Sequence, residues 1–427
     1  MKTKFAIVLA SLLIAPLAQA QCVGDVAVDS RVDGGDLGAL ISNWGPINPN
    51  SPVSRASDLN GDGSVNGADL GLLLTNWGYC PSSIGSVSPS FGVPAGGTLL
   101  TITGENLNYV TDVYVGGRAA SSVTILNAGH LTVVAPPGAG GSIADIVVAG
   151  PQGTATLAAA FRYVAVPAWA TLVELVPDPA VVTDAALRDA VVSTGFAWRV
   201  RETSTQVEML LVPPGAFQMG CTDESPGGCT SAELPVHTVT LTNPVYLGRF
   251  EITQGQFLNT MNFNPAFFSI WWYSPGMPVE QVTWDSIQGY LARTGFRLPT
   301  EAEWEFACRA GTTTAFYNGS NDDTGLGSLG WYVGNSIGLT HGVGEKQPNR
   351  LGFYDMAGNV WEWVSDFYGP YSAEAQVNPT GAMSGTRVLR GGSFTDGSGS
   401  LRSSSRMAAS PDVLYYRNGG FRVARNP

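Results

Sequence analysis

Residues Arg297 to Trp304 read RLPTEAEW, and this stretch decides the fold of the C-terminal half of the chain. Thr300 followed three residues later by Glu303 forms a capping box, which predicts a helix over residues 299–309. Aromatic side chains at helical spacing are usually core residues, so Trp304 and Phe306 are expected to anchor this helix in the interior. We therefore expect the stretch to be structural rather than catalytic.

Further motifs accompany this helix in a fixed order. They read VEMLLVPPGAFQMG (Val207 to Gly220), LGFYDMAGNVWEW (Leu351 to Trp363), RGGSF (Arg390 to Phe394) and GFRVAR (Gly420 to Arg425). Several ordered motifs are far more specific than one short pattern. Together they resemble the formylglycine-generating, or sulfatase-modifying-factor, family. The resemblance implies an α+β domain over residues 184–427, rich in irregular structure, with a C-type-lectin-like fold.

The chemistry of that family depends on residues that this chain lacks. Family members carry a pair of copper-binding cysteines just after the GGS turn, where this chain has Thr395 and Asp396. Cu(I) is a soft ion that prefers thiolates, which aspartate and serine cannot replace. No cysteine follows Cys308, which lies in an apolar helical pattern and is expected to be a buried free thiol. We therefore expect no copper, no catalytic residues, and a role in binding or as an interaction module.

Two enzymatic alternatives stay open at this point. One is a divergent sulfatase-modifying oxidoreductase of the formylglycine-generating type. The other is a non-haem iron enzyme on the same fold, in which His237, His341 and a carboxylate would form a facial triad. His237 lies in the alternating stretch PVHTVTL, which indicates a half-buried strand, and His341 lies in a glycine-rich loop that is expected to be exposed.

The resemblance also implies a ligand groove. Trp361 and Ser393 match its residues, and Asp396 lies beside them in the sequence TDGSGSLRSSSR, residues 395–406. Lectin-like binding proteins diversified by retroelements place their variable positions in the corresponding segment. Its small polar side chains can hydrogen-bond many ligands but include no nucleophile and base pair. We expect a protein or carbohydrate ligand; the alternative is a flexible surface loop without one.

The run DMAGNVWEW matches a structural calcium site of the same family. By resemblance, the ligands are the side chains of Asp355 and Glu362 and the carbonyl groups of Gly358 and Val360. A set of oxygen ligands on a loop suits a hard cation such as calcium.

An internal repeat opens the chain: DGGDLGALISNWG (Asp33 to Gly45) returns as NGADLGLLLTNWG (Asn66 to Gly78). A loop with clustered oxygen ligands precedes each copy, as calcium requires. The repeat resembles the dockerin type I family, which implies a small all-α tandem calcium module over residues 21–82. The second loop offers the side chains of Asp58, Asn60, Asp62 and Asp69 and the carbonyl of Ser64; the first offers Asp25, Asp29, Asp33 and Asp36.

The two loops are not equivalent. Ala27 and Ser30 occupy the third ligand position and the turn-glycine position of the first loop, so the second loop is expected to bind calcium more tightly. The dockerin resemblance implies a cohesin partner recognised through loop positions 10 and 11. Those positions hold Gly34, Gly35, Gly67 and Ala68 instead of hydroxyl or charged residues. We expect an anchoring module whose partner is cohesin-like or lies on a cell surface.

Short alternating runs separated by Gly, Pro and Asn turns fill residues 84–164, which predicts a small antiparallel sandwich. The runs SVSPSFGVPAGGTLLTITGENL, VYVGG, APPG and FRYV resemble the IPT/TIG family, an all-β immunoglobulin-like domain. Residues 165–183 are expected to be a linker, followed by a helix over about residues 184–193 that Thr183 caps.

Residues 1–20 show the order of a secretory signal: Lys2 and Lys4, an apolar run, and Ala18-Gln19-Ala20. The apolar run is too short to span a bilayer, so we expect no membrane span. Removing this segment changes the formal charge from −12 to −14 through loss of its two lysines, which argues against nucleic acid as a partner. The pairs Cys22–Cys80 and Cys221–Cys229 are expected to form disulfides in an oxidising compartment, secreted, at the cell surface or periplasmic.

Overall fold

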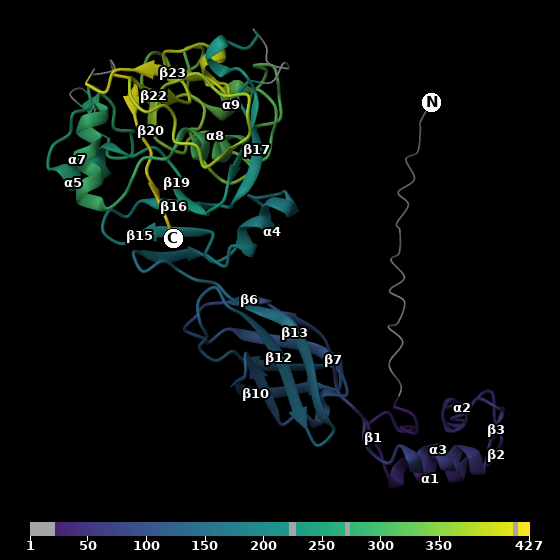
Figure 1. Ribbon diagram of the computed structural model, residues 1–427. Coiled ribbons are helices and arrows are strands. Elements are labelled where there is room, and N and C mark those ends of the chain that lie inside the picture. Colours follow the sequence, from purple (N-terminus) through teal and green to yellow (C-terminus); the bar gives the residue numbers. More distant parts are fainter. Residues whose placement is uncertain (1–21, 222–227, 270–273, 413–416) are drawn as a thin grey trace, which may run out of the picture. The chain divides into compact units, whose positions relative to one another are not determined.

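The computed structural model describes residues 22–221, 228–269, 274–412 and 417–427. The expected signal segment, residues 1–20, lies outside the described residues. The chain divides into two compact units, residues 1–163 and 164–427 (Figure 1). It is multidomain, as expected, with a helical N-terminal module, a β-sandwich and a mixed α/β C-terminal domain. Among the described residues, no helix is both long and apolar enough to cross a membrane.

The sequence repeat folds into two equivalent halves. Each half has a ligand-type loop and a nine-residue helix that starts with a capping box: α1 (Gly34–Ser42) and α3 (Gly67–Thr75). A shorter helix, α2 (Pro52–Ser57), lies between them in the sequence. The loop strand of each half pairs with the segment that follows the helix of the other half. These pairs are β1 (Arg31–Val32) with β4 (Gly78–Tyr79), and β3 (Ser64–Val65) with β2 (Gly45–Pro46).

The core of this module repeats in the same way. Val32 and Leu40 of the first half and their counterparts Val65 and Leu73 are all fully buried in one cluster. The disulfide Cys22–Cys80 joins the two ends of the module across 58 residues of sequence, with a Cα–Cα distance of 5.6 Å. Closing a loop of that length removes about 4 kcal/mol of chain entropy from the unfolded state. Such a small core needs this covalent support.

The sandwich has two sheets, with strand orders β10-β11-β7-β5 and β6-β13-β12-β8-β9. All its pairs are antiparallel except β6 with β13. Alternate residues of the central strands are buried, as the alternating sequence predicts, and Phe161 and Tyr163 close the core. The strands are β5 (Ser83–Ser88), β6 (Phe91–Gly92), β7 (Leu99–Glu105), β8 (Asp112–Val115), β9 (Arg118–Ala119), β10 (Ser121–Asn127), β11 (His130–Val134), β12 (Ile143–Gly150) and β13 (Gly153–Tyr163).

A five-stranded sheet forms the base of the C-terminal unit, and the last strand of the chain returns beside β19 to complete it (Figure 1). Its order is β14 (Ala170–Glu174), β15 (Arg199–Glu202), β16 (Glu208–Val212), β19 (Val245–Gly248) and β25 (Ala424–Arg425). The expected linker over residues 165–183 is therefore wrong. Its prolines flank the strand instead of interrupting it, so the backbone of β14 is free to pair with β15.

The described residues of this unit also form two smaller sheets. One contains β17 (Gly215–Met219), β18 (His237–Leu241) and β21 (Gln376–Val377). The other contains β23 (Arg406–Ala409), β22 (Arg387–Arg390), β20 (Trp361–Phe367) and β24 (Gly419–Gly420). Long irregular segments connect these strands, as the composition predicts.

In the described part of this unit the α-helices are α4 (Ala185–Ser193), α5 (Gln254–Met261), α7 (Trp284–Thr294), α8 (Glu301–Arg309) and α9 (Leu326–Leu329). The capping box of Thr300 and Glu303 is present on α8. Trp304 is fully buried and Phe306 packs edge-on against Phe217, so RLPTEAEW is structural as expected. Asp184, not Thr183, caps α4, because its carboxylate accepts bonds from two amides of the first turn.

Candidate functional site

A buried ion pair holds the strand that leads into the GGS turn. Arg390, the last residue of β22, is fully buried and its guanidinium pairs with Glu305 of α8. Glu305 also holds Arg309, at 2.8 Å, and accepts a bond from the amide of Gly220 at 2.9 Å. A buried carboxylate persists only when its oxygens are paired in this way. The helix of RLPTEAEW is thereby locked to the strand that leads into the turn.

The turn itself requires glycine. Gly392 has a positive φ of +72°, and a Cβ atom there would lie 2.7 Å from the carbonyl oxygen of Ser400. Residues other than glycine rarely adopt this conformation, and backbone contacts cannot yield as a side chain can. The motif RGGSF is therefore a backbone requirement that presents Ser393 at a fixed position.

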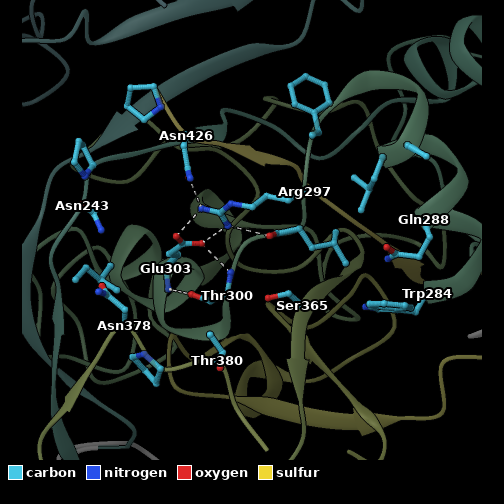
Figure 2. Close-up of a pocket in the computed structure, with 18 of the residues that line it drawn as sticks. Asn243, Trp284, Gln288, Arg297, Thr300, Glu303, Ser365, Asn378, Thr380 and Asn426 are labelled. Carbon is cyan, nitrogen blue, oxygen red and sulfur yellow. Dashed lines mark hydrogen bonds and ion pairs between the residues drawn. The ribbon is translucent and has the colours of Figure 1, made fainter. Parts of the chain in front are cut away.

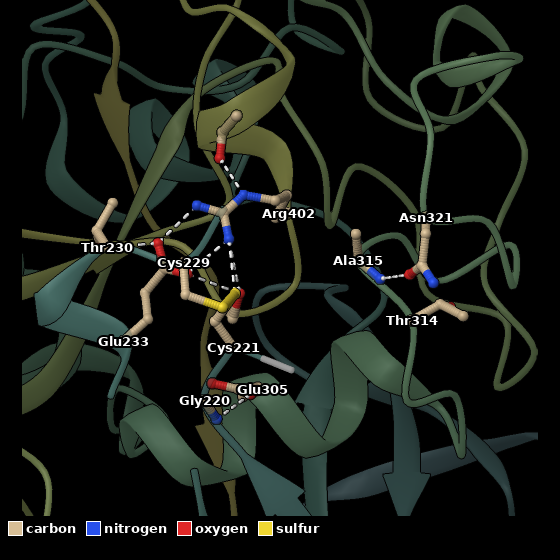
Figure 3. Close-up of a disulfide and its surroundings, with 12 residues drawn as sticks. Gly220, Cys221, Cys229, Thr230, Glu233, Glu305, Thr314, Ala315, Asn321 and Arg402 are labelled. Carbon is tan, nitrogen blue, oxygen red and sulfur yellow. Dashed lines mark hydrogen bonds and ion pairs between the residues drawn. A yellow bond between two sulfur atoms is a disulfide. The ribbon is translucent and has the colours of Figure 1, made fainter. Parts of the chain in front are cut away.

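The second half of the segment 395–406 is not a flexible surface loop. Arg402 is 4% exposed, and its guanidinium donates hydrogen bonds to both carboxylate oxygens of Glu233, at 2.6 and 2.7 Å. Figure 3 shows this guanidinium beside both Glu233 and the disulfide Cys221–Cys229; its Nη1 lies 3.2 Å from the Sγ of Cys221. Ser403, Ser404 and Ser405 are buried as well. This half of the segment is scaffold, and the remaining surface is residues 395–400.

Cysteines that are distant in the sequence thus meet this segment in space. Cys221 lies 181 residues before Arg402 in the sequence, yet its Sγ contacts the Arg402 guanidinium. Both sulfurs are joined in a disulfide, so neither is a thiolate ligand in this state.

The three predicted groove residues come together. The indole Nε1 of Trp361 donates to Oδ2 of Asp396 at 2.9 Å, and the hydroxyl of Ser393 donates to the same oxygen. Asn418 donates to the Ser393 hydroxyl at 3.2 Å and to the Thr395 hydroxyl at 3.2 Å. Trp361 and Ser393 are buried, whereas Asp396 is half-buried and Thr395 is exposed. The polar atoms at this turn are oxygens and amide nitrogens, a donor set that suits hydrogen bonding and does not fit Cu(I).

The remaining thiol offers no replacement. Cys308 is free and fully buried in α8. Burial raises the pKa of its thiol to about 11, so almost none is thiolate at neutral pH.

The predicted calcium ligands of the GNVWEW run lie in a buried acidic cluster. Asp355 accepts a bond from the amide of Gly344 through Oδ2 at 2.7 Å, and its Oδ1 is buried without a partner. Glu362 instead has both oxygens engaged, by Arg422 and by the indole Nε1 of Trp304. Gly358 has a positive φ of +87°, and a Cβ there would lie 2.2 Å from the carbonyl oxygen of Trp331. Of these two carboxylates, Asp355 is therefore the one with an oxygen that accepts no hydrogen bond.

Sequence reasoning missed a third carboxylate in this cluster. Glu251 is buried and accepts bonds from the amide of Val360 at 3.0 Å and from the side chain of Asn359 at 2.7 Å. Burial, and then the neighbouring carboxylates, raise the pKa of Glu251 well above its usual value. Burial likewise raises the pKa of Asp355 to about 6. Three carboxylates thus surround one arginine, Arg422, and this excess of buried negative charge favours a cation.

Carboxylate oxygens gather in the first loop of the N-terminal module. In the first loop, oxygens of Asp25, Asp29 and Asp36 all lie within 4.8 Å of one another. Burial and the facing carboxylates of Asp36 and Asp29 raise the pKa of Asp25, against the lowering effect of two backbone hydrogen bonds. The carboxylate of Asp33 lies apart from this group and caps α1.

The second loop is held by its own side chains. Asp58 accepts bonds from the amides of Asp62 and Gly63, and Asp69 accepts bonds from Leu59, Asn60 and Asn66. Asp62 is exposed, and its Oδ2 accepts a bond from the side chain of Asn60 at 2.9 Å. Positions 10 and 11 of the two loops, through which a dockerin would recognise a cohesin, are all exposed: Gly34, Gly35, Gly67 and Ala68.

Neither histidine is placed for iron. His237 is buried in β18 with its Nδ1 3.1 Å from the carbonyl of Pro235. His341 was expected to be exposed, and this expectation is wrong. Its ring stacks on Trp331 with 3.6 Å between the ring centroids, and its Nε2 lies 3.0 Å from the carbonyl oxygen of Ser336. Among the described residues, neither belongs to a group of three or more metal-ligating side chains.

Comparison with family models assigns the three parts of the chain. The model of the Sulfatase-modifying factor enzyme 1-like domain matches residues 195–427, the IPT/TIG domain matches residues 82–163, and the Dockerin type I domain matches residues 23–76.

Curated relatives are similar to the C-terminal part. The formylglycine-generating enzyme of Streptomyces coelicolor is 30% identical over 268 residues, 48% of this chain and 83% of its own length. That of Thermomonospora curvata is 34% identical over 173 residues, 36% of this chain and 57% of its own length. The inactive C-alpha-formylglycine-generating enzyme 2 of Mus musculus is 36% identical over 162 residues, 35% of this chain and 49% of its own length. Among solved structures, Treponema denticola variable protein 1 is 28% identical, with a TM-score of 0.47 over 53% of this chain and 98% of that protein.

Proposed function

The chain belongs to the family of proteins with a Sulfatase-modifying factor enzyme 1-like domain, and from that premise we propose that this domain binds a ligand instead of making formylglycine. The carboxylate of Asp396 carries the proposal. It stands just after the GGS turn and is bonded to Trp361 and Ser393. The turn therefore offers hard oxygen atoms where copper chemistry requires thiolates.

The other cysteines support this conclusion. Of the five in the chain, four are paired in disulfides and Cys308 is fully buried. A binding role needs only the exposed edge of the groove, where Thr395 and Gly397 are accessible and Asp396 is partly so. The ligand is a protein or a carbohydrate, held by hydrogen bonds to these groups.

We expect calcium to be the cation that this chain binds. Dockerin domains bind calcium, and the loops supply oxygen ligands from Asp25, Asp29 and Asp36 in the first half and from Asp58, Asn60, Asp62, Ser64 and Asp69 in the second. In the C-terminal domain the buried Oδ1 of Asp355, with the carbonyls of Gly358 and Val360, would hold a third ion. Glu362 would join only by sharing an oxygen with Arg422.

The dockerin module and the two disulfides indicate an extracellular protein. A dockerin implies a cohesin partner, and here the small residues Gly34, Gly35, Gly67 and Ala68 would meet it. In this proposal the first 20 residues direct export, the module anchors the chain outside the cell, and the sandwich separates the anchor from the binding domain.

Metal analysis of the purified, calcium-loaded full chain tests this function. We expect calcium without stoichiometric copper or iron, and one calcium fewer per chain in an Asp355→Ala variant. Copper-supplemented protein incubated with a sulfatase-type peptide with a CxPxR core should leave the mass of its cysteine unchanged. Stoichiometric copper, or conversion above a control without protein, would refute the binding role; an unchanged calcium content in Asp355→Ala would refute the third site.

A further inference from the structure

A large cavity lies in the C-terminal unit on residues that the proposed function does not use. Its volume is about 860 Å³, and it opens between α7, the start of α8, and the segments around Asn243 and Asn378 (Figure 2). Small-molecule sites usually occupy roughly 300–1,000 Å³. The cavity is therefore large enough for a ligand of two or more sugar rings.

One face of α7 forms a wall of this cavity. Trp284, Gln288 and Leu291 follow one another at helical spacing and line it together. Trp284 is only half-buried, because it starts the helix at the cavity edge. Its indole Nε1 donates to the carbonyl of Val364 at 3.2 Å, and the guanidinium of Arg387 lies 3.9 Å from its ring centroid. The ring is therefore held in place before a ligand arrives.

The charged side chains that line the cavity are paired with each other. Of the residues that line it, Arg297 and Glu303 are the charged ones, and they bind each other through two hydrogen bonds of 2.7 Å. Glu303 also accepts a hydrogen bond from the backbone amide of Thr300, and Arg297 also donates to the side-chain oxygen of Asn426, as Figure 2 shows. The lining side chains therefore offer no free charge to a charged ligand, which favours a neutral one.

The polar groups of the wall are neutral donors and acceptors. The amide Nε2 of Gln288 is buried and has no hydrogen-bond partner, which leaves a donor that an incoming oxygen would satisfy. The hydroxyls of Ser365 and Thr380 and the amide of Asn243 also line the cavity. The apolar part of the lining includes Phe196, Phe296 and Leu241.

From these observations we propose that this cavity binds a neutral saccharide, a function beyond the one proposed above. A sugar presents an apolar face of C–H groups, which packs on an aromatic ring, and hydroxyls that both donate and accept hydrogen bonds. A fixed tryptophan, an unpaired amide donor and lining side chains without net charge match those three properties. An extended peptide would also be neutral, but its backbone needs a row of paired donors and acceptors, and the cavity offers scattered side chains.

Ligand-observed NMR and calorimetry on the full, calcium-loaded chain test this site. The probes are cellobiose, maltose and N,N′-diacetylchitobiose, with a uronic acid disaccharide and a neutral hexapeptide as competing classes, each up to roughly 10 mM. We expect at least one neutral disaccharide to bind and the charged one not to bind. Trp284→Ala should weaken this binding about tenfold or more, since truncating a packed aromatic anchor is costly. Gln288→Leu, which leaves the ring in place, should weaken it about three- to tenfold.

Asp285→Asn is the matched control, because Asp285 lies on α7 next to Trp284 but is exposed and does not line the cavity. It should bind the disaccharide as the unchanged chain does. The proposal is overturned if none of the neutral disaccharides binds, if binding is the same in Gln288→Leu, or if only the uronic acid or the hexapeptide binds. Should Trp284→Ala fail to fold, Gln288→Leu alone decides.

Discussion

Replacing Arg402 by methionine tests whether the segment after the GGS turn is scaffold. The side chain of Arg402 is 5% exposed and that of Glu233 is 2% exposed, and two hydrogen bonds of 2.6 and 2.7 Å join them. Arg402 also donates to the carbonyl of Gly399 at 3.0 Å. Methionine has a similar length and no charge, so the change removes the partner of Glu233 while filling most of the space.

The expected cost follows from what remains. Glu233 would keep hydrogen bonds from the hydroxyls of Thr230 and Ser404, both at 3.1 Å. It would lose Arg402, its only ion-pair partner among the described residues. Removing one member of a buried ion pair costs about 3–5 kcal/mol. For a domain of this size that lowers the melting temperature by about 6–20 °C. Adding Glu233→Gln removes the unpaired charge and should recover more than about 1 kcal/mol of that loss.

Denaturant unfolding of the full chain in calcium, followed by tryptophan fluorescence, measures these values. Of the tryptophans in the chain, only Trp44 and Trp77 lie in the N-terminal unit, so the signal reports mainly on the C-terminal unit. Arg293→Met, an exposed position on α7, is the control and should cost less than about 0.5 kcal/mol. A cost under about 1 kcal/mol for Arg402→Met, or a double variant as unstable as the sum of the single ones, would refute a buried ion pair here.

Two further predictions concern calcium and pH. In calorimetric titration of the full chain with calcium, Asp62→Ala should remove the tighter N-terminal binding phase, and Asp25→Ala should remove the weaker one. The reason is that only the second loop keeps every side-chain ligand and its turn glycine. Survival of the tighter phase in Asp62→Ala would contradict this order. Burial, and then the charge of Glu301, raise the pKa of Asp366 from 3.8 to about 7. Between these two pH values the folded chain binds a proton that the unfolded chain releases. The free energy of unfolding therefore falls as the pH rises from about 4 to about 7. Asp366→Asn cannot ionise and should gain about 1–4 kcal/mol over the unchanged chain above pH 7 and about nothing at pH 4; an equal difference at both pH values would show that ionisation of Asp366 is not the cause.

The sequence by itself determined the local structure and the order of the parts. The capping box of Thr300 and Glu303 depends on residues three apart, and the helix α8 begins there as predicted. The N-terminal repeat likewise predicted two equivalent loop and helix units, because each copy contains its own ligands and cap. The three groove residues could be named because two of them lie in motifs whose order is specific.

Other features depended on groups that only the folded chain brings together. Glu251 and Arg422 lie 171 residues apart and share one buried cluster with Asp355, and nothing in the sequence around Glu251 indicates this. Arg402 looked like a residue of a polar surface loop, and it is buried because Glu233 lies opposite. The strand β14 looked like a linker because its partner, β15, follows 25 or more residues later.

The physical reason is the same in each case. A cap, a turn glycine or an amphipathic stripe gains its free energy from neighbours within a few residues, so the sequence displays it directly. A buried charge or an edge strand is stable only when a distant partner pays its desolvation cost, and the identity of that partner is a property of the tertiary structure. The motifs therefore determined which domains this chain forms, and the tertiary structure decided which of its polar residues are scaffold, which remain open to a cation, and where a ligand can enter.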